Sequence, residues 1–216
     1  MIERTSCFIV FMVATMVPAA ELEDRSFAIH IDKKLAGNYH LQINTKDDGT
    51  QMASMQADVK VKSSIFTYKY SFRGSEAWKD GKVLQVSTST NDNGKKHTVF
   101  VTAMADGLSI NANGKETTVN GEPWISTWWR LPSSLTPGPR CLLLDADTGK
   151  VLQGKIANMG IEKITLLGTP VNCFHWRIRG DMEADLWFDG THRLVRQESV
   201  EEGHHTLLEL TDLKRQ

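Results

Sequence analysis

The sequence lacks any strong excess of charge, because 25 Lys and Arg residues stand against 26 Asp and Glu residues and leave a formal net charge of −1. Such a balance provides no overall field to attract nucleic acid or an anionic membrane. Cysteine is also scarce, with three residues in 216, which excludes a disulfide-stapled scaffold. The length fits one domain, or at most two small ones, with a sizeable core.

Local signatures of common enzymes are missing as well. The chain has no Gly-x-Ser-x-Gly, no His-Glu-x-x-His, no phosphate-binding glycine loop and no Cys-x-x-Cys. We therefore assign no catalytic residue, no cofactor and no metal site. A hydrolase assembled from scattered residues stays open as the third of three functional alternatives.

The longest apolar run lies at the N-terminus, over residues 7–17, and is too short to span a bilayer. Small residues follow at Val17 and Ala19, and an acidic segment comes after them. The pattern predicts a signal peptide over residues 1–19, with a single domain over 20–216 that is periplasmic or secreted and has no transmembrane segment. The alternative is an N-terminal anchor or a buried helix.

Removal of the signal would leave two of the cysteines, Cys141 and Cys173. An exported protein folds where disulfides can form, so these two residues are the candidates for a bridge. The alternative of two small, buried, unpaired thiols is equally compatible with the sequence, because a disulfide requires a short Cα separation that the sequence does not reveal.

Apolar and polar residues alternate along most of the chain, in short runs separated by turn residues. This period of two is typical of half-buried strands, and the short connections require antiparallel neighbours. Asn-Gly pairs at 93–94 and 113–114 favour tight hairpins. The predicted strands are 27–31, 39–43, 55–61, 66–72, 83–90, 98–102, 108–111, 116–119, 141–144, 151–158, 161–167, 171–179, 182–188, 194–200 and 204–213.

Residues 123–135 break this pattern. Three tryptophans, Trp124, Trp128 and Trp129, recur there near helical spacing, between Pro123 and Pro132. Proline suits the first turn of a helix and also ends one, so the segment predicts a short Trp-rich helix.

So many consecutive antiparallel strands cannot remain one flat sheet, because strand twist makes large sheets curl, split or close. We expect a mainly β fold in which a single large antiparallel sheet curls into a half-barrel or barrel. An eight-stranded barrel can fill its interior with its own side chains, whereas eleven or more strands enclose space that needs a plug or a guest. The Trp-rich helix is the expected plug, and the residues expected to contact a ligand are Tyr68, Tyr70, Phe72, Trp128, Trp129 and Trp187.

Several segments resemble the landmarks of a secreted bacterial domain family of unknown function. They lie at 87–94, 128–129, 148–150, 164–171, 185–189, 194–196, 202–203 and 208–210. The resemblance spans about Phe27 to Leu213, and its motifs are turn and core residues. That family is similar to the periplasmic lipoprotein-carrier (LolA/LolB-like) superfamily, whose members curl a sheet around helices and often hold acyl chains. The resemblance implies an envelope β protein that binds an apolar ligand, and it assigns no catalytic role.

Four polar constellations favour ordinary structural roles. The segment from Asp145 to Gly149 begins like a calcium loop but lacks the later glycine and glutamate, so it predicts a hairpin turn. His204 and His205 point to opposite faces of a strand and cannot easily share a metal. His175, with Cys173 and Arg177 on the same face, predicts a solvent-side row, and Glu183 with Asp185 predicts a solvated acid pair.

Two function classes lead. The first is non-catalytic binding of a lipid or other hydrophobic small molecule in the concave face of the sheet. The second is a structural or interaction module with a filled core, whose partner is another envelope protein. Neither class involves nucleic acid.

Overall fold

The computed structural model describes residues 21–62, 66–132, 137–201 and 203–216. These residues form fifteen strands and, within this described part, no helix. The strands are β1 (Glu21–Ile31), β2 (Lys34–Thr45), β3 (Gln51–Lys62), β4 (Thr67–Lys79), β5 (Lys82–Asp92), β6 (Lys95–Met104), β7 (Gly107–Ala112), β8 (Lys115–Asn120), β9 (Trp124–Ile125), β10 (Gly138–Leu144), β11 (Val151–Leu166), β12 (Thr169–Gly180), β13 (Ala184–Phe188), β14 (Leu194–Glu201) and β15 (His204–Arg215).

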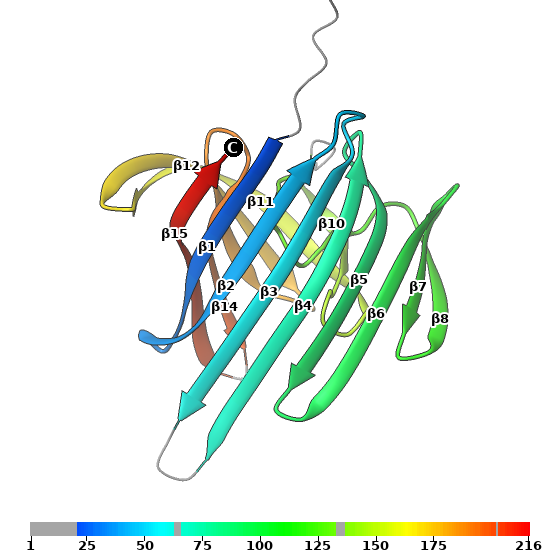
Figure 1. The fold of residues 1–216 in the computed structure, drawn as a ribbon, viewed down its shortest axis with the longest axis horizontal. Coiled ribbons are helices and arrows are strands. Elements are labelled where there is room, and N and C mark those ends of the chain that lie inside the picture. The colour runs from blue at the N-terminus through cyan, green and yellow to red at the C-terminus, as the bar shows by residue number, and fades with distance from the viewer. Residues whose placement is uncertain (1–20, 63–65, 133–136, 202) are drawn as a thin grey trace, which may run out of the picture.

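All fifteen strands belong to one sheet, and neighbours in sequence are neighbours in space. From a central pair, β1 and β15, the strands β2 to β8 follow outward on one side and β14 to β9 on the other. Figure 1 shows the two halves, with the blue to green strands in front of the yellow and orange ones, and the red β15 beside β1 at the left. Within the described residues β8 and β9 do not pair with each other, so the sheet is curled but not closed.

The mainly β class and the single large sheet are confirmed, with one difference in strand direction. Every pair of neighbours is antiparallel except β9 and β10, which run parallel through Trp124 and Ile125 beside Leu143 and Leu144. A parallel pair needs a long connection, and the chain between Ile125 and β10 provides it. The sheet is therefore mixed rather than purely antiparallel.

The predicted Asn-Gly hairpins form where the sequence places them. Asn93 and Gly94 have φ values of 47° and 97°, and Asn113 and Gly114 have values of 54° and 84°. Two successive residues with positive φ define the type I′ turn, whose twist matches that of the flanking strands. These turns join β5 to β6 and β7 to β8.

The core lies inside the curl. In β2, the apolar residues Tyr39, Leu41 and Ile43 are buried, while the alternate polar residues are exposed. The main hydrophobic cluster joins residues from both halves of the sheet, among them Leu41 and Val101 from one half and Leu144 and Val195 from the other. Burial of these side chains in one cluster stabilises the curled form of the sheet.

The predicted Trp-rich helix is wrong for the described part of its range. Trp124 belongs to β9, and Trp128 has a φ of 50°, which a right-handed helix does not allow. The residues between them form a turn in which the Trp128 N–H donates to the carbonyl of Ile125. Trp124 and Trp128 meet edge to face at 4.5 Å in a second apolar cluster, whereas Trp129 packs in the main core. Residues 133–136 lie outside the described part.

The fold bears on two further sequence expectations, and a third lies outside the described residues. The strands predicted at 151–158 and 161–167 are one strand, β11, with an irregularity between Asn158 and Gly160. Cys141 and Cys173 are both free thiols, and Cys141 packs on the second cluster while Cys173 lies in the main core. The predicted signal peptide and its cleavage site fall outside the described residues. No helix in the described part has the length and apolarity of a membrane span.

Candidate functional site

A cavity of about 400 Å³ lies between the two halves of the sheet. Strands β3 and β4 line one wall with aromatic and small apolar side chains, and the opposite wall contains Trp128 and the turn at 145–148. Strands β1, β2, β5, β6, β14 and β15, with Ser126, Thr127 and Met182, complete the lining. The full set is Ile29, Ile31, Tyr39, Ala57, Val59, Tyr68, Tyr70, Phe72, Thr90, Asp92, Lys95, His97, Ser126, Thr127, Trp128, Asp145, Ala146, Asp147, Thr148, Met182, Gln197, Ser199, Glu201, Thr206 and Leu208.

The structure brings four of the six predicted ligand residues to this cavity. Tyr68, Tyr70 and Phe72 alternate on the inner face of β4, beside Val59 and Ala57 of β3. Trp128 reaches the cavity from the turn after β9. The aromatic wall thus combines one regular strand with one irregular turn.

The other two predicted residues lie elsewhere. Trp129 packs edge to face on Trp78 at 6.0 Å between ring centroids, in the main core. Trp187 stacks against His175 at 4.4 Å between ring centroids, among the polar contacts of β11 to β14. Neither tryptophan lines the cavity.

Asp147 is a partly buried acid that lines the cavity. The hydroxyls of Tyr70 and Thr90 each donate a hydrogen bond of 2.8 Å to the same oxygen, Asp147 Oδ1. Burial raises the pKa of Asp147 to about 6, and the charges of Asp145 and Glu201 add to the rise. This carboxyl therefore titrates close to neutral pH while in contact with a ligand-sized space.

The turn that contains Asp147 is the hairpin turn predicted in place of a calcium loop, and it connects β10 to β11. It docks into the opposite half of the sheet, where Thr88 of β5 donates to the Ala146 carbonyl at 2.6 Å. Within its own half, the Ala146 N–H donates to the Ser126 hydroxyl at 2.9 Å. Sequence reasoning identified the turn but missed its docking, because Thr88 and Ala146 are 58 positions apart.

Glu76 fixes the segment that positions Trp128. Its carboxyl accepts hydrogen bonds from the indole N–H groups of Trp78 at 2.6 Å and Trp129 at 2.7 Å, and from the Thr127 hydroxyl. Arg130 lies over both indole rings, at 5.6 Å and 5.4 Å from their centroids. Burial raises the pKa of Glu76 above its ordinary value, while the three donors oppose that rise.

Sequence reasoning overlooked Glu76, although a signal was present. Glu76 shares the inward face of β4 with Tyr70, Phe72 and Trp78, because all four occupy even positions of one strand. A carboxyl on an otherwise apolar face is buried among partners or belongs to a site. The identity of its partners depended on the fold.

Tyr39 contributes a polar group without a partner. Its side chain lines the cavity and is 9% exposed, and its buried hydroxyl forms no hydrogen bond with any described residue. An unpaired buried hydroxyl is costly unless water or a ligand satisfies it.

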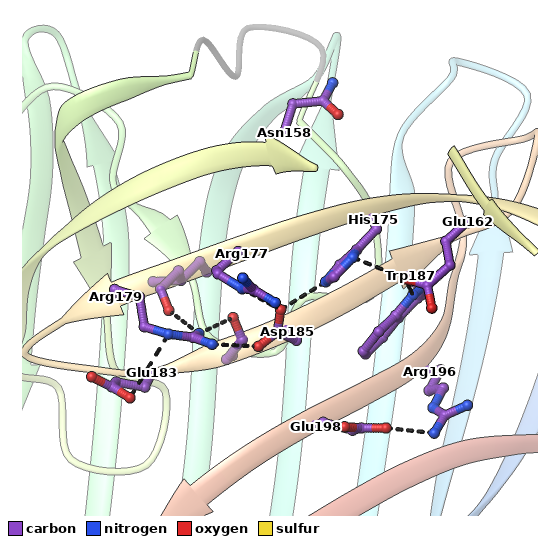
Figure 2. Close-up of polar contacts among 12 residues, drawn as sticks. Asn158, Glu162, His175, Arg177, Arg179, Glu183, Asp185, Trp187, Arg196 and Glu198 are labelled. Atoms are coloured by element: carbon purple, nitrogen blue, oxygen red, sulfur yellow. Dashed lines mark hydrogen bonds and ion pairs between the residues drawn. The ribbon is translucent and has the colours of Figure 1, made fainter. Parts of the chain in front are cut away.

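A second polar cluster occupies another face of β12 to β14, as Figure 2 shows. His175 Nε2 lies 2.7 Å from Asp185 and its Nδ1 lies 3.0 Å from Glu162. The predicted solvent-side row is therefore wrong for His175 and Cys173, which are 8% and 1% exposed. The cause is the pair of carboxylates and the indole of Trp187, which enclose the imidazole.

This cluster does not form a nucleophilic site. Both nitrogens of His175 already face carboxylates, so neither is left to activate a thiol. Burial raises the pKa of the Cys173 thiol to about 11, which keeps it protonated. Asp185 is paired with Arg177 and Arg179, which corrects its predicted solvation, while the Glu183 side chain is 58% exposed.

His204 and His205 interact with separate acids, Asp32 at 2.8 Å and Glu198 at 3.7 Å. Within the described ranges, no group of three or more His, Cys, Asp or Glu residues is arranged to hold a metal ion. The cavity between the two halves of the sheet has the dimensions of a ligand site.

The fold and cavity define a β-barrel-like protein with an open, curled sheet. Residues 27–211 match the model of a domain of unknown function, DUF6134, and the chain belongs to that family. This range nearly equals the stretch over which the sequence resembles a family of unknown function. No curated protein matches the chain significantly.

Solved structures share the fold. One of them is the crystal structure of a β-barrel-like protein of a domain of unknown function, DUF1849, from Brucella abortus. The TM-score is 0.64 at 9% sequence identity, and the match covers 91% of this chain and 98% of that one. An identity this low shows a common fold and nothing about function.

Proposed function

We propose that the protein binds a small molecule with a largely apolar body in the cavity between the two halves of its sheet. The observation that carries the proposal is the cavity itself, whose volume of about 400 Å³ falls within the usual range for ligand sites. Its wall of Tyr68, Tyr70, Phe72 and Trp128 has the aromatic character of such sites. A lipid or another hydrophobic molecule of that size is the proposed ligand.

The alternative of a completely filled interior is less well supported, because the cavity leaves space within the curl. The docked turn and the Glu76 contacts hold the cavity walls in place without filling it. Preformed walls favour binding, since little order has to be created when a ligand enters.

We further propose that the chain is exported, to the periplasm or out of the cell. The support is the apolar N-terminal run followed by a cleavage-like site. N-terminal sequencing of the mature protein, isolated from separated cell fractions, tests this: a new terminus at Ala20 in an envelope or external fraction is expected. An intact N-terminus in the cytoplasmic fraction would refute export.

Native mass spectrometry tests the binding proposal on protein purified from the cells that produce it. A noncovalent adduct of a few hundred daltons, lost on denaturation, is the expected result. If the mass is that of the bare chain and an added neutral apolar probe also fails to bind, the proposal is wrong.

A further inference from the structure

The charged groups around the cavity are mainly acidic. Four carboxylates line it, those of Asp92, Asp145, Asp147 and Glu201, against a single lysine, Lys95. Lys95 stands opposite Asp92 in the hairpin between β5 and β6, so its charge lies next to an acid. A ligand with an anionic head would meet net repulsion in this cavity.

Asp147 has no cationic partner among the described residues. Both hydrogen bonds to its side chain come from neutral hydroxyls, and both end on Oδ1. Oδ2 is therefore the oxygen to which a ligand can donate. The neighbouring charges of Asp145 and Glu201 and the burial of the carboxyl all disfavour its ionised form, and the pKa of Asp147 is raised accordingly. Buried carboxylates are normally paired, so this one gains most from a cation supplied from outside.

Two independent features at the same cavity indicate a ligand. The first is the partly buried carboxyl of Asp147, which lines the cavity and accepts hydrogen bonds only from neutral hydroxyls. The second is the concentration of aromatic rings, Tyr68, Tyr70, Phe72 and Trp128, on the cavity walls. Aromatic faces attract organic cations and also accept apolar chains.

We propose that the ligand is an organic cation, with an ammonium group at Asp147 and an apolar body against the aromatic wall. This inference rests on the proposed function and specifies the class of molecule that the cavity selects. The ammonium donates to Asp147 Oδ2, and its charge offsets the excess of carboxylates. The bond is charge-assisted and lies out of bulk water, where such bonds are strongest.

Three probes with the same eight-carbon chain separate charge from hydrophobicity: octylammonium, octanol and octanoate. Isothermal titration of the purified protein at pH 7.5 measures the Kd of each. We expect octylammonium to bind at least about tenfold more tightly than octanol, and octanoate to bind most weakly.

Asp147→Asn keeps the shape of the side chain and removes its charge, and Asp106→Asn makes the same change at an exposed turn residue as the matched control. In Asp147→Asn, the preference for octylammonium over octanol falls below about threefold, and a wild-type circular dichroism spectrum reports that the variant is folded. In Asp106→Asn, the preference remains.

The outcomes distinguish this inference from the proposal on which it rests. If octanol does not bind the unaltered protein, the proposed function fails. If octanol binds but octylammonium binds no more tightly, or the preference survives in Asp147→Asn, the organic-cation inference alone is overturned. Equal competition by calcium chloride at the same concentration would also overturn it, because the carboxylates would then select charge without regard to the organic body.

Discussion

The hydroxyl of Tyr70 donates a hydrogen bond of 2.8 Å to Oδ1 of Asp147, which is 77 positions away in the sequence. This bond joins β4, in one half of the sheet, to the turn between β10 and β11, in the other half. It lies at the cavity wall, so the same contact that holds the curl together also presents a carboxyl to the enclosed space.

The Tyr70 and Asp147 side chains should be energetically coupled. Tyr70→Phe and Asp147→Ala each remove the bond, and a double-mutant cycle by urea denaturation isolates their interaction. We expect a coupling free energy of about 1.5–3 kcal/mol, the range for a hydrogen bond to a charged group. A coupling near zero would show that the contact does not hold the two halves together.

Asp147 should make stability depend on pH in a defined direction. Its pKa rises from 3.8 in the unfolded chain to about 6 in the folded one, so the folded state holds the proton more tightly. The resulting stabilisation is complete below about pH 4 and disappears as pH rises through about 6. A tenfold change in proton affinity corresponds to about 1.4 kcal/mol, so the effect is at most about 3 kcal/mol.

The measurement is the free energy of unfolding of wild type and Asp147→Asn between pH 4 and pH 8. The wild type should lose stability relative to the variant across this range. Asp145 in the same turn, Glu201 on β14, and Lys95 and His97 on β6 also line the cavity, and they are present in both proteins. A difference that is independent of pH would contradict the assignment to Asp147.

Removal of the Glu76 carboxyl should be severe. Glu76→Ala leaves the buried indole N–H groups of Trp78 and Trp129 and the partly buried hydroxyl of Thr127 without their acceptor. We expect a loss of at least about 3 kcal/mol in stability, together with a shift in tryptophan emission as the indoles rearrange. Glu116→Ala, at an exposed position of β8, is the control and should change neither quantity. A mild effect of Glu76→Ala would mean that water replaces the carboxyl.

Leu167→Asn should stabilise the protein. Leu167 is 58% exposed and has a φ of 50°, in a two-residue turn with Gly168 between β11 and β12. Leucine is disfavoured in this left-handed conformation, whereas asparagine tolerates it, so we expect a gain of about 0.5–1 kcal/mol. Asn93→Leu, in the equivalent turn between β5 and β6, should have the opposite sign. Thermal unfolding measures the stability change in both variants. Changes of the same sign would refute the explanation.

Local patterns predicted the strands and their turns well. The alternation of Tyr39, Leu41 and Ile43 places them inside, and positive φ at Asn93 and Gly94 follows from the residue types themselves. The strand count also predicted that the sheet would curl, because twist forbids a flat sheet of that size.

Features that depend on distant partners could not be predicted. The spacing of Trp124, Trp128 and Trp129 is helical. However, Glu76 of β4, which is 53 positions before Trp129, accepts a hydrogen bond from the Trp129 indole N–H and holds the segment in a turn. The alternation around His175 predicts a surface residue, and only the fold places Glu162 and Asp185 on either side of it. Four residues of the cavity were identified because they are aromatic, whereas Asp147 was not, since its role depends on the docking of its turn.

The proposed binding function depends on the cavity, and a cavity-filling substitution tests it most directly. Ala57 lines the cavity and is 6% exposed, whereas Ala103 is exposed on β6. Fluorescence titration with the neutral probe N-phenyl-1-naphthylamine compares wild type, Ala57→Phe and Ala103→Phe, each checked for a wild-type circular dichroism spectrum. We expect equal Kd values for wild type and Ala103→Phe, and binding at least about tenfold weaker in Ala57→Phe. Equal binding by all three proteins, or binding by none, would contradict a ligand site in this cavity.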